Sequence, residues 1–385
     1  MSFVWLVMVL GVAHAAAGVI AVCVVVRGGR LDGARLVWAG GLATMVVVGS
    51  LWYVRRRFDL TPFEMLSLVY VDLAVVGPLV GASVVFALWR VRGEAGWRPW
   101  VGVGRVLGVC AVMPLPVALW ATFVEPNLLV VERASVEVTQ ARRPSRPIRV
   151  AVVADVQNWR VGAQERRVLA RLRDVQPDLI VIPGDLFQPA RRTWPDFQPA
   201  LDEVADDFRW FLASMHEIAP TFFTPGNCEY GYNDRALIDG TGVEYLRYSE
   251  PGRVEVGGRR VYVFGVGFAL TARSAPHELA RMATLVEDDD VVVLVSHSPD
   301  TVLVLPGGAR PDVTVAGHTH GGQVKIPWYG PILRASRVPR KVAGGGLHEV
   351  NGNRVYVSRG VGVERMHSPR VRFNCVPEVS LIELR

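Results

Sequence analysis

Five short apolar segments in the last two thirds of the chain constrain its fold more than any other feature, because each leads to residues of metal-binding type. The segments 148–154, 179–183, 221–225, 291–296 and 313–316 lead to Asp155, Asp185, Asn227, His297 and the pair His318 and His320. Runs this apolar are typical of strands buried on both faces of a sheet. Functional groups in such sheets gather at the carboxyl ends of the strands. We therefore expect these side chains to meet on one rim.

The last of these segments continues as Gly317-His318-Thr319-His320-Gly321-Gly322. Side chains two residues apart in an extended segment point the same way, so both rings reach one small volume. The glycines let the backbone turn away. Taken singly, the acids are ordinary helix caps or turn residues. Together with an amide oxygen and imidazoles, they favour two divalent transition ions bridged by one carboxylate.

The order of these motifs resembles the calcineurin-like metallophosphoesterase family, whose pattern is Asp-x-His, Gly-Asp, Gly-Asn-His-Asp/Glu, His and Gly-His-x-His. The matching stretches are Asp155–Gln157, Gly184-Asp185, Gly226-Asn227-Cys228-Glu229, His297 and Gly317–His320. Tyr356–Gly360 and Arg372–Glu378 extend the similarity to the membrane-associated branch, which includes enzymes that cleave the pyrophosphate of UDP-2,3-diacylglucosamine. The resemblance implies an α+β or α/β fold: a four-layer sandwich of two mixed β-sheets flanked by helices.

The resemblance also implies the ligands of a dinuclear centre. One ion would be held by Asp155, Asp185 and His320, and the other by Asp185, Asn227, His297 and His318, with Asp185 bridging. A metal-bridging hydroxide would attack phosphorus, and the residues expected at the reacting phosphate are Asn227, Cys228 and His318. Two divalent metal ions are expected as cofactors, Mn²⁺ first, with Zn²⁺ or Fe as alternatives.

Two positions depart from the family pattern. Gln157 replaces a histidine, and its amide oxygen would be a weaker ligand for the first ion. Cys228 replaces the histidine that protonates the leaving group, a contribution typically worth about 10²–10⁴-fold in rate. Arg359, Arg365 and His367 are candidate replacements. We favour a tolerated variant of an active enzyme. The alternative is a catalytically weakened membrane protein that binds or senses a phosphorylated ligand.

The first third of the chain has a different pattern. Its long apolar stretches are 3–26, 36–54, 65–89 and 100–124. Each is near or above the ~18–20 residues that cross a bilayer, which predicts four transmembrane helices in residues 1–124. Residues 125–147 would form a connector and residues 148–385 the phosphoesterase domain. Asp72 is expected to reach the membrane interface, and His14 shows no partner.

Arginines are almost evenly divided among the links between these stretches, so the charge distribution barely decides orientation. We expect a multi-pass protein of a bacterial-type inner or plasma membrane. The uncharged N-terminus favours an orientation that places the catalytic domain outside the cytoplasm. The basic run 142–149 suits anionic lipid headgroups, and ordinary topology charge explains it equally well.

The expected partners are the membrane and a phosphorylated lipid or other phosphoester substrate, with a nucleotide-linked lipid as one candidate. Residues 187–199 and 334–337, with Trp328 and Tyr329, are expected to shape its pocket. No motif for nucleic-acid binding is present, and the sequence does not define an oligomeric state. The function predicted from the sequence is therefore hydrolysis of a phosphoester or pyrophosphate by a membrane-anchored, metal-dependent phosphoric ester hydrolase.

Overall fold

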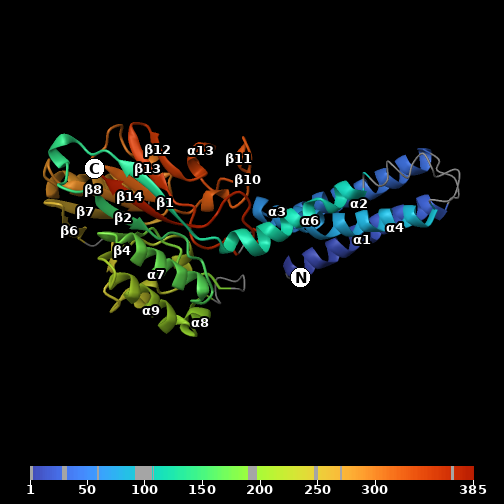
Figure 1. Cartoon of the computed structure of the whole chain (residues 1–385), viewed down its shortest axis with the longest axis horizontal. Helices are drawn as coiled ribbons and strands as arrows, with labels where there is room; N and C mark the ends of the chain where they lie inside the picture. Colours follow the sequence, from blue (N-terminus) through green and yellow to red (C-terminus); the bar gives the residue numbers. More distant parts are fainter. Residues whose placement is uncertain are drawn as a thin grey trace. The chain divides into compact units, whose positions relative to one another are not determined.

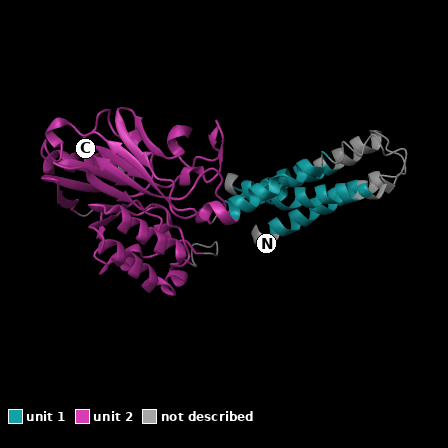
Figure 2. Cartoon of the chain, in the orientation of Figure 1, with its two compact units in different colours: residues 1–122, 367–369 teal, residues 123–366, 370–385 magenta. Residues whose placement is uncertain are grey.

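The computed structural model describes residues 3–27, 33–58, 60–91, 106, 108–189, 197–246, 250–268, 271–365 and 368–385. These form two compact units, shown in Figures 1 and 2. The helical unit comprises residues 1–122 with 367–369, and the sheet unit comprises residues 123–366 with 370–385.

Two six-stranded mixed sheets dominate the sheet unit (Figure 1). The first has the order β1 (Val130–Val136), β14 (Glu378–Leu384), β2 (Ile148–Val152), β3 (Leu179–Ile182), β4 (Thr221–Phe223) and β5 (Glu244–Tyr245). The second has the order β12 (Gly346–Val350), β13 (Asn353–Val357), β9 (Val313–Ala316), β8 (Val291–Ser296), β7 (Arg259–Val266) and β6 (Gly252–Val256). Strands β2 to β5 are mutually parallel, as are β13, β9, β8 and β7, so the carboxyl ends of neighbouring strands share an edge.

Side chains alternate between the two faces of each buried strand, as the pleat requires. In β2, Val150 and Val152 enter the core between the two sheets, whereas Ala151 joins the core beneath the helices on the outer face. In β8, Val293 lies between the sheets and Leu294 points outward. Both faces are therefore apolar, which explains the nearly continuous apolar runs in the sequence.

Helices cover both outer faces, giving the helix–sheet–sheet–helix layers of the predicted sandwich. The helices of this unit are α7 (Ala163–Val175), α8 (Phe197–Asp202), α9 (Ala205–His216), α10 (Asp234–Ile238), α11 (Thr271–Leu285), α12 (Thr301–Val304) and α13 (Arg340–Ala343). Leu169 of α7 and Phe211 of α9 share the core of the first sheet's outer face. Met282 of α11 packs with Leu294 on the outer face of the second sheet.

Strand β1 comes from the segment 125–147, which the sequence predicts to be a connector. It pairs in parallel with β14 over its whole length, from Val130 opposite Glu378 to Val136 opposite Leu384. The pairing gives the backbone groups of this segment partners in the sheet, so part of the predicted connector is structural. A two-stranded hairpin, β10 (Lys325–Ile326) and β11 (Gly330–Pro331), extends from the loop that follows β9.

The helical unit contains α1 (Phe3–Arg27), α2 (Gly33–Phe58), α3 (Pro62–Val71), α4 (Gly77–Val91) and α6 (Pro114–Leu119), with π-helical turns at Asp72–Val76 and Trp120–Val124. Among the described residues, Glu64–Phe86 and Gly108–Asn127 are long and apolar enough to cross a bilayer, and Leu6–Val22 is a shorter apolar helix. Helices α1 and α2 cover the first two predicted spans. Residues 100–105 and 107 of the fourth predicted span lie outside the described residues.

A buried polar cluster connects three helical segments of this unit. The Nδ1 atom of His14 lies 2.8 Å from Asp72 Oδ1, and its Nε2 atom lies 2.5 Å from Ser50 Oγ. The side chain of His14 is 1% exposed and that of Asp72 is 19% exposed. The sequence carries no signal for a partner of His14, and the structure supplies two, with Asp72 turned toward it. The π-helical turn that begins at Asp72 re-aims this side chain from an otherwise regular helix.

Candidate metal centre

The loops at the carboxyl ends of β2, β3 and β9 have an unusual backbone. Residues with positive φ there are Asp155 (48°), Gln157 (37°), Asp185 (57°), His318 (69°) and His320 (49°). Left-handed backbone costs a non-glycine residue of order 1 kcal/mol and persists where the surrounding structure imposes it. Five of the seven residues predicted as metal ligands thus lie in strained turns at one edge of the fold. Such strain is typical of sites that hold side chains in fixed positions.

His297 is the centre of one group of donors. Its Nδ1 atom lies 2.7 Å from the Pro183 carbonyl oxygen, which can only accept, so Nδ1 carries the proton. Burial lowers the pKa of His297 to about 4, and the neutral ring therefore has a lone pair on Nε2. That atom lies 3.0 Å from Asn227 Oδ1 and 3.0 Å from His318 Nδ1. The lone pairs of His297 Nε2 and Asn227 Oδ1 therefore face one another in a buried site, which favours a cation that both can bind.

The ring of His318 is neutral for a similar reason. Burial, followed by the nearby His297, lowers its pKa to about 3. Phe268 packs against both imidazoles, with ring centroids 4.9 Å from His318 and 5.5 Å from His297. These contacts fix the ring orientations before any ligand binds, which is how surrounding groups usually orient metal-binding histidines.

The second group surrounds Asp155. Both carboxylate oxygens of Asp155 lie 3.0 Å from the His318 backbone N–H, which donates to them. Burial, then the charge of Asp185, raises the pKa of Asp155 well above its ordinary value. His320 is buried, and among the residues that the structure describes neither of its ring nitrogens has a partner in hydrogen-bond geometry, nor does Gln157 Oε1. An unsatisfied buried polar atom costs about 1–3 kcal/mol, so this set of donors fits a bound metal ion.

Asp185 lies between the two groups. Its Oδ1 atom accepts the Cys228 backbone N–H at 2.8 Å. Its Oδ2 atom accepts from Gln157 Nε2 at 2.7 Å and lies 3.4 Å from His297 Nε2. Burial raises the pKa of Asp185 to about 7. The centre is compact enough to surround a cation, because one ligand atom from each of Asp155, Asp185 and His297 lies within 4.8 Å of the other two.

Two glycines leave room for this packing. A Cβ atom on Gly226 would lie 2.3 Å from Asp185 Oδ1 and 2.7 Å from His297 Nδ1. A Cβ atom on Gly317 would lie 2.7 Å from Asp155 Oδ2. Such distances are sterically forbidden. The glycines before Asn227 and His318 are therefore required by the close approach of backbone to ligand side chains.

Glu229 has a structural role that the sequence does not assign. Its Oε2 accepts the backbone N–H groups of Gly226 at 2.6 Å and Asp185 at 2.8 Å. Its Oε1 accepts the Leu186 N–H at 2.9 Å and the Tyr232 hydroxyl at 2.6 Å. One buried carboxylate therefore ties the loop after β3 to the loop after β4. The family pattern includes an acid at this position, and that was its only signal in the sequence.

Cys228 is fully buried beside these ligands. Its Sγ lies 3.5 Å from Gln157 Nε2, and burial raises the pKa of its thiol well above the ordinary value. The group is therefore a neutral thiol. Of the candidate replacements, Arg359 forms ion pairs with Glu132 at 2.9 Å and Glu378 at 2.6 Å. Arg365 donates to Gln157 O, and His367 lies outside the described residues. Both described arginines thus serve structural contacts.

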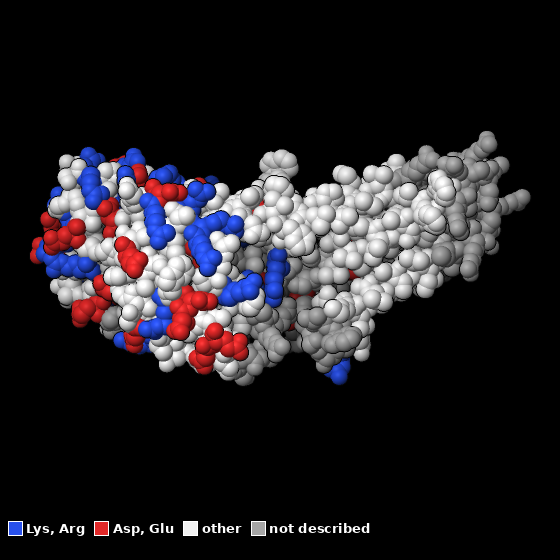
Figure 3. Space-filling view, turned by 60° about the horizontal axis from the view of Figure 1, so that its bottom comes forward, with Lys and Arg blue, Asp and Glu red and all other residues white. Residues whose placement is uncertain are grey.

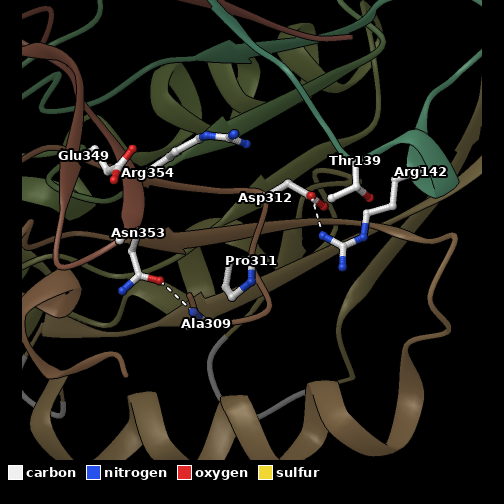
Figure 4. Close-up of a pocket in the computed structure, with 9 residues that line it drawn as sticks. Thr139, Arg142, Ala309, Pro311, Asp312, Glu349, Asn353 and Arg354 are labelled. Carbon is white, nitrogen blue, oxygen red and sulfur yellow. Dashed lines mark hydrogen bonds and ion pairs between the residues drawn. The ribbon is translucent and has the colours of Figure 1, made fainter. Parts of the chain in front are cut away.

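A separate pocket of about 210 Å³ lies in the same unit (Figure 4). It is lined by Thr139, Arg142, Ala309, Pro311, Asp312, Glu349, Gly352, Asn353 and Arg354. Arg142 is paired with Asp312 at 2.8 Å, and Asn353 Oδ1 accepts the Ala309 N–H at 2.9 Å. Arg354 donates to the carbonyl oxygen of Glu137. The lining of this pocket contains none of the predicted metal ligands. The side chains of Arg142, Asp312, Asn353 and Arg354 already have protein partners.

Comparisons with known proteins agree with this geometry. Residues 148–322 match the model of the calcineurin-like phosphoesterase family. Phosphodiesterase YaeI of Escherichia coli is 30% identical over 217 residues, which cover 54% of this chain and 71% of YaeI. The chain belongs to the calcineurin-like phosphoesterase family. It is therefore a metal-dependent phosphoric ester hydrolase by family, as the sequence predicts.

Two further relatives place the chain within this family. The uncharacterized metallophosphoesterase YkuE of Bacillus subtilis is 26% identical over 233 residues, covering 57% of this chain and 72% of YkuE. UDP-2,3-diacylglucosamine pyrophosphatase LpxG of Chlamydia trachomatis is 23% identical over 342 residues, covering 73% of this chain and 98% of LpxG. The resemblance to this branch, stated from the motifs alone, is confirmed.

Proposed function

We propose that this phosphoesterase is anchored in a membrane and uses two divalent metal ions to hydrolyse a phosphoester or pyrophosphate bond of a lipid-linked substrate. One observation carries the metal centre: the lone pair of His297 Nε2 faces Asn227 Oδ1 and His318 Nδ1 at 3.0 Å each. Asp185 Oδ2 lies 3.4 Å from the same atom. Neutral and anionic donors converge there in a buried volume, as they do around a cation.

The proposed first site consists of Asp155, Gln157, Asp185 and His320, and the proposed second site of Asp185, Asn227, His297 and His318. Mixed carboxylate, amide and imidazole donors suit Mn²⁺, with Zn²⁺ or iron as alternatives. Bound divalent ions supply Lewis-acid stabilisation of phosphoryl charge and lower the pKa of an attacking water.

The chain's own residues prepare this chemistry. Phe268 and the Pro183 carbonyl hold His297 in one orientation, so the donors need little rearrangement when substrate binds. Asn227 and His318, at the edge of the second site, are proposed to border the phosphoryl group. The neutral thiol of Cys228 carries no positive charge to offer the leaving group, so this enzyme is expected to protonate it less effectively than a histidine would.

The β10–β11 hairpin supports a lipid-linked substrate. Trp328 is fully exposed, and Ile326 and Tyr329 are 46% and 56% exposed. The hairpin directly follows the turn that contains His320, and a Cβ atom on Gly322 would lie 2.3 Å from Pro331 Cβ, so hairpin and turn are packed together. Exposed aromatic and aliphatic side chains beside a phosphoesterase site suit an acyl chain or a bilayer surface. The relative LpxG is named for a diacylated substrate.

Membrane anchoring is proposed from the helical unit. Besides its candidate spans, it exposes large apolar side chains such as Val12 (71%) and Met45 (73%). Few charged side chains appear on the described part of this unit in Figure 3, whereas they are abundant on the sheet unit. Lipid contact would remove this apolar surface from water. Four spans, and a catalytic unit outside the cytoplasm, remain part of the proposal.

A second candidate function has one specific observation in its favour. The amide nitrogen of Gln157, rather than its oxygen, faces Asp185, and Cys228 adds a neutral thiol beside it. A site arranged in this way suits a membrane module that binds a phosphorylated ligand with little turnover. The variant Gln157→His/Cys228→His distinguishes the two: a large gain in hydrolysis supports a weakened site, and no gain supports a tuned enzyme.

The first experiment uses the full chain purified in detergent. Hydrolysis of a soluble aryl phosphodiester and of UDP-2,3-diacylglucosamine is measured with Mn²⁺, Zn²⁺ or Fe²⁺, beside Asp185→Ala and His318→Ala. We expect metal-dependent turnover that both variants lose. Trp328→Ala should lower turnover of the lipid substrate and leave that of the soluble one unchanged. A wild-type chain without bound metal would overturn the proposal.

A further inference from the structure

The segment 361–365 lies directly on the loop that carries Asp155 and Gln157. The Val361 N–H donates to Ala154 O at 2.9 Å, and the Gly362 N–H donates to Asp155 O at 2.8 Å. A Cβ atom on Gly362 would lie 2.0 Å from Val156 O, a distance that no side chain tolerates. Glycine at this position therefore lets two segments more than 200 residues apart in sequence come into backbone contact.

This contact brings Glu364 into the candidate metal centre. Gln157 Nε2 lies 3.3 Å from Glu364 Oε2 and 2.7 Å from Asp185 Oδ2. One amide group therefore donates toward two carboxylates at once. A primary amide has two hydrogens, so it can donate to both carboxylates, and this bridge keeps Glu364 within one amide group of the proposed bridging ligand.

Neighbouring groups hold Glu364 in this position. Its backbone N–H donates to Gln323 Oε1 at 2.6 Å, and its Oε1 accepts from Gln188 Nε2 at 3.0 Å. The next residue, Arg365, donates its backbone N–H to Gln188 Oε1 at 2.8 Å and its Nε to Gln157 O at 2.7 Å. Two glutamines and an arginine thus fix the direction of the carboxylate, in the way that surrounding hydrogen bonds orient metal ligands.

The electrostatics of the site extend to Glu364. Burial is the main cause of the raised pKa of Asp185, and the negative charge of Glu364 adds to it. Asp155, Asp185 and Glu364 thus bring three carboxylates to a group of histidines that burial keeps neutral. Beside them, both ring nitrogens of His320 and Gln157 Oε1 are buried without a hydrogen-bond partner in the described part of the chain. Clustered carboxylates beside unsatisfied donors of this kind need a compensating cation.

We propose that Glu364 is an additional ligand of the first metal ion, completing the site of Asp155, Asp185 and His320 where position 157 offers only an amide. This inference rests on the proposed two-metal function. A third carboxylate offsets more of the charge of two divalent ions, and carboxylate oxygen favours Mn²⁺ more than an imidazole does. The first site would then be richer in oxygen than the second.

The test measures metal binding by the full chain in detergent. Wild type, Glu364→Gln and the control Glu349→Gln, at an exposed position of β12, are loaded with Mn²⁺ and dialysed. Metal per chain is then measured by mass spectrometry and the coupling of two Mn²⁺ ions by electron paramagnetic resonance. We expect two coupled ions in wild type and control, and one uncoupled ion in Glu364→Gln. Binding of the ion lost should weaken about 10–100-fold.

Further variants separate this inference from the function on which it rests. Glu364→Asp keeps the charge with a shorter reach and should lose less affinity than Glu364→Gln. The double variant Gln157→His/Glu364→Gln should regain the second ion. Two ions bound equally tightly by wild type and Glu364→Gln would overturn the inference and leave the proposed function standing. A wild-type chain that binds no metal would overturn both.

Discussion

The two sides of the candidate metal centre are built differently. Around His297, neutral donors from three loops lie 3.0 Å apart and are held by Phe268 and the Pro183 carbonyl. Around Asp155, the His320 ring finds no hydrogen-bond partner among the described residues, and the Gln157 amide bridges Asp185 and Glu364. The group around His297 is preorganised, whereas the group around Asp155 depends on an ion to satisfy it. We therefore expect the second metal site, which contains His297, to fill first and to bind more tightly than the first site, which contains Asp155.

The largest effect should come from Asp185, because this residue alone belongs to both sides. Asp185→Asn removes the bridging charge and should eliminate both ions, lowering the rate of aryl phosphodiester hydrolysis by about 10³-fold, or about 4 kcal/mol. Asp178→Asn, whose parent side chain pairs with Arg146 away from the site, is the matched control. Retention of two ions and normal turnover by Asp185→Asn would contradict the assignment of a bridging ligand.

A pair of variants compares the two sides directly. His297→Asn should abolish tight binding at the second site and, with it, most turnover, about 10²-fold or about 3 kcal/mol. His320→Asn should remove only the weaker ion and leave one tightly bound ion per chain. Isothermal titration with Mn²⁺ separates these outcomes. If His320→Asn removed the tighter ion instead, the proposed order of the two sites would be reversed.

Much of this arrangement could be predicted from the sequence because it depends on local pattern. The apolar runs before Asp155, Asp185, Asn227, His297 and His318 are strands β2, β3, β4, β8 and β9, and the ligand-type residues follow at their carboxyl ends. Burial on both faces makes such strands visible in a single sequence. Pairing of parallel strands then brings residues from distant positions to one edge without further information.

The parts that could not be predicted depend on contacts between distant segments. Glu364 reaches Gln157 only because Gly362 allows a close backbone approach. A glycine in a loop does not by itself indicate which distant segment it contacts. His14 and Asp72 are 58 residues apart on different helices, so neither sequence neighbourhood shows the pair. The amide orientation of Gln157 likewise depends on which carboxylates surround it.

Gln157→His should bring the metal affinity of the first site closer to that of the second. An imidazole is a stronger ligand for a borderline ion than an amide, so affinity at the first site should rise about 10-fold or more. Affinity at the second site should change much less, because the Gln157 amide donates to Asp185, Cys228 and Glu364, of which only Asp185 belongs to that site. Titration of the metal-free chain measures both constants. Equal affinities in wild type and variant would show that position 157 does not contact the ion.

The smallest effect on metal affinity should come from Glu229, which supports both sides without touching either proposed ion. Its two oxygens each accept two hydrogen bonds, and glutamine keeps only one of these oxygens. The amide group of Glu229→Gln must then face the Leu186 N–H and the Tyr232 hydroxyl, or the N–H groups of Gly226 and Asp185. The hydroxyl can rotate to accept, whereas a backbone N–H cannot, so the first arrangement leaves one buried N–H unsatisfied.

That unsatisfied group should lower the free energy of unfolding by about 1–3 kcal/mol, measured by thermal or denaturant unfolding of the metal-free chain. Tyr232→Phe is the comparison variant: it removes one hydrogen bond from Glu229 and the long 3.4 Å contact in which the Tyr232 hydroxyl accepts the Phe187 N–H, and it keeps all three backbone hydrogen bonds of the carboxylate. Its loss should be smaller. Since Glu229 ties the loop after β3 to the loop after β4, Glu229→Gln should weaken both ions together, unlike any variant confined to one side. Selective loss of one ion would mean that the carboxylate supports only one half of the centre.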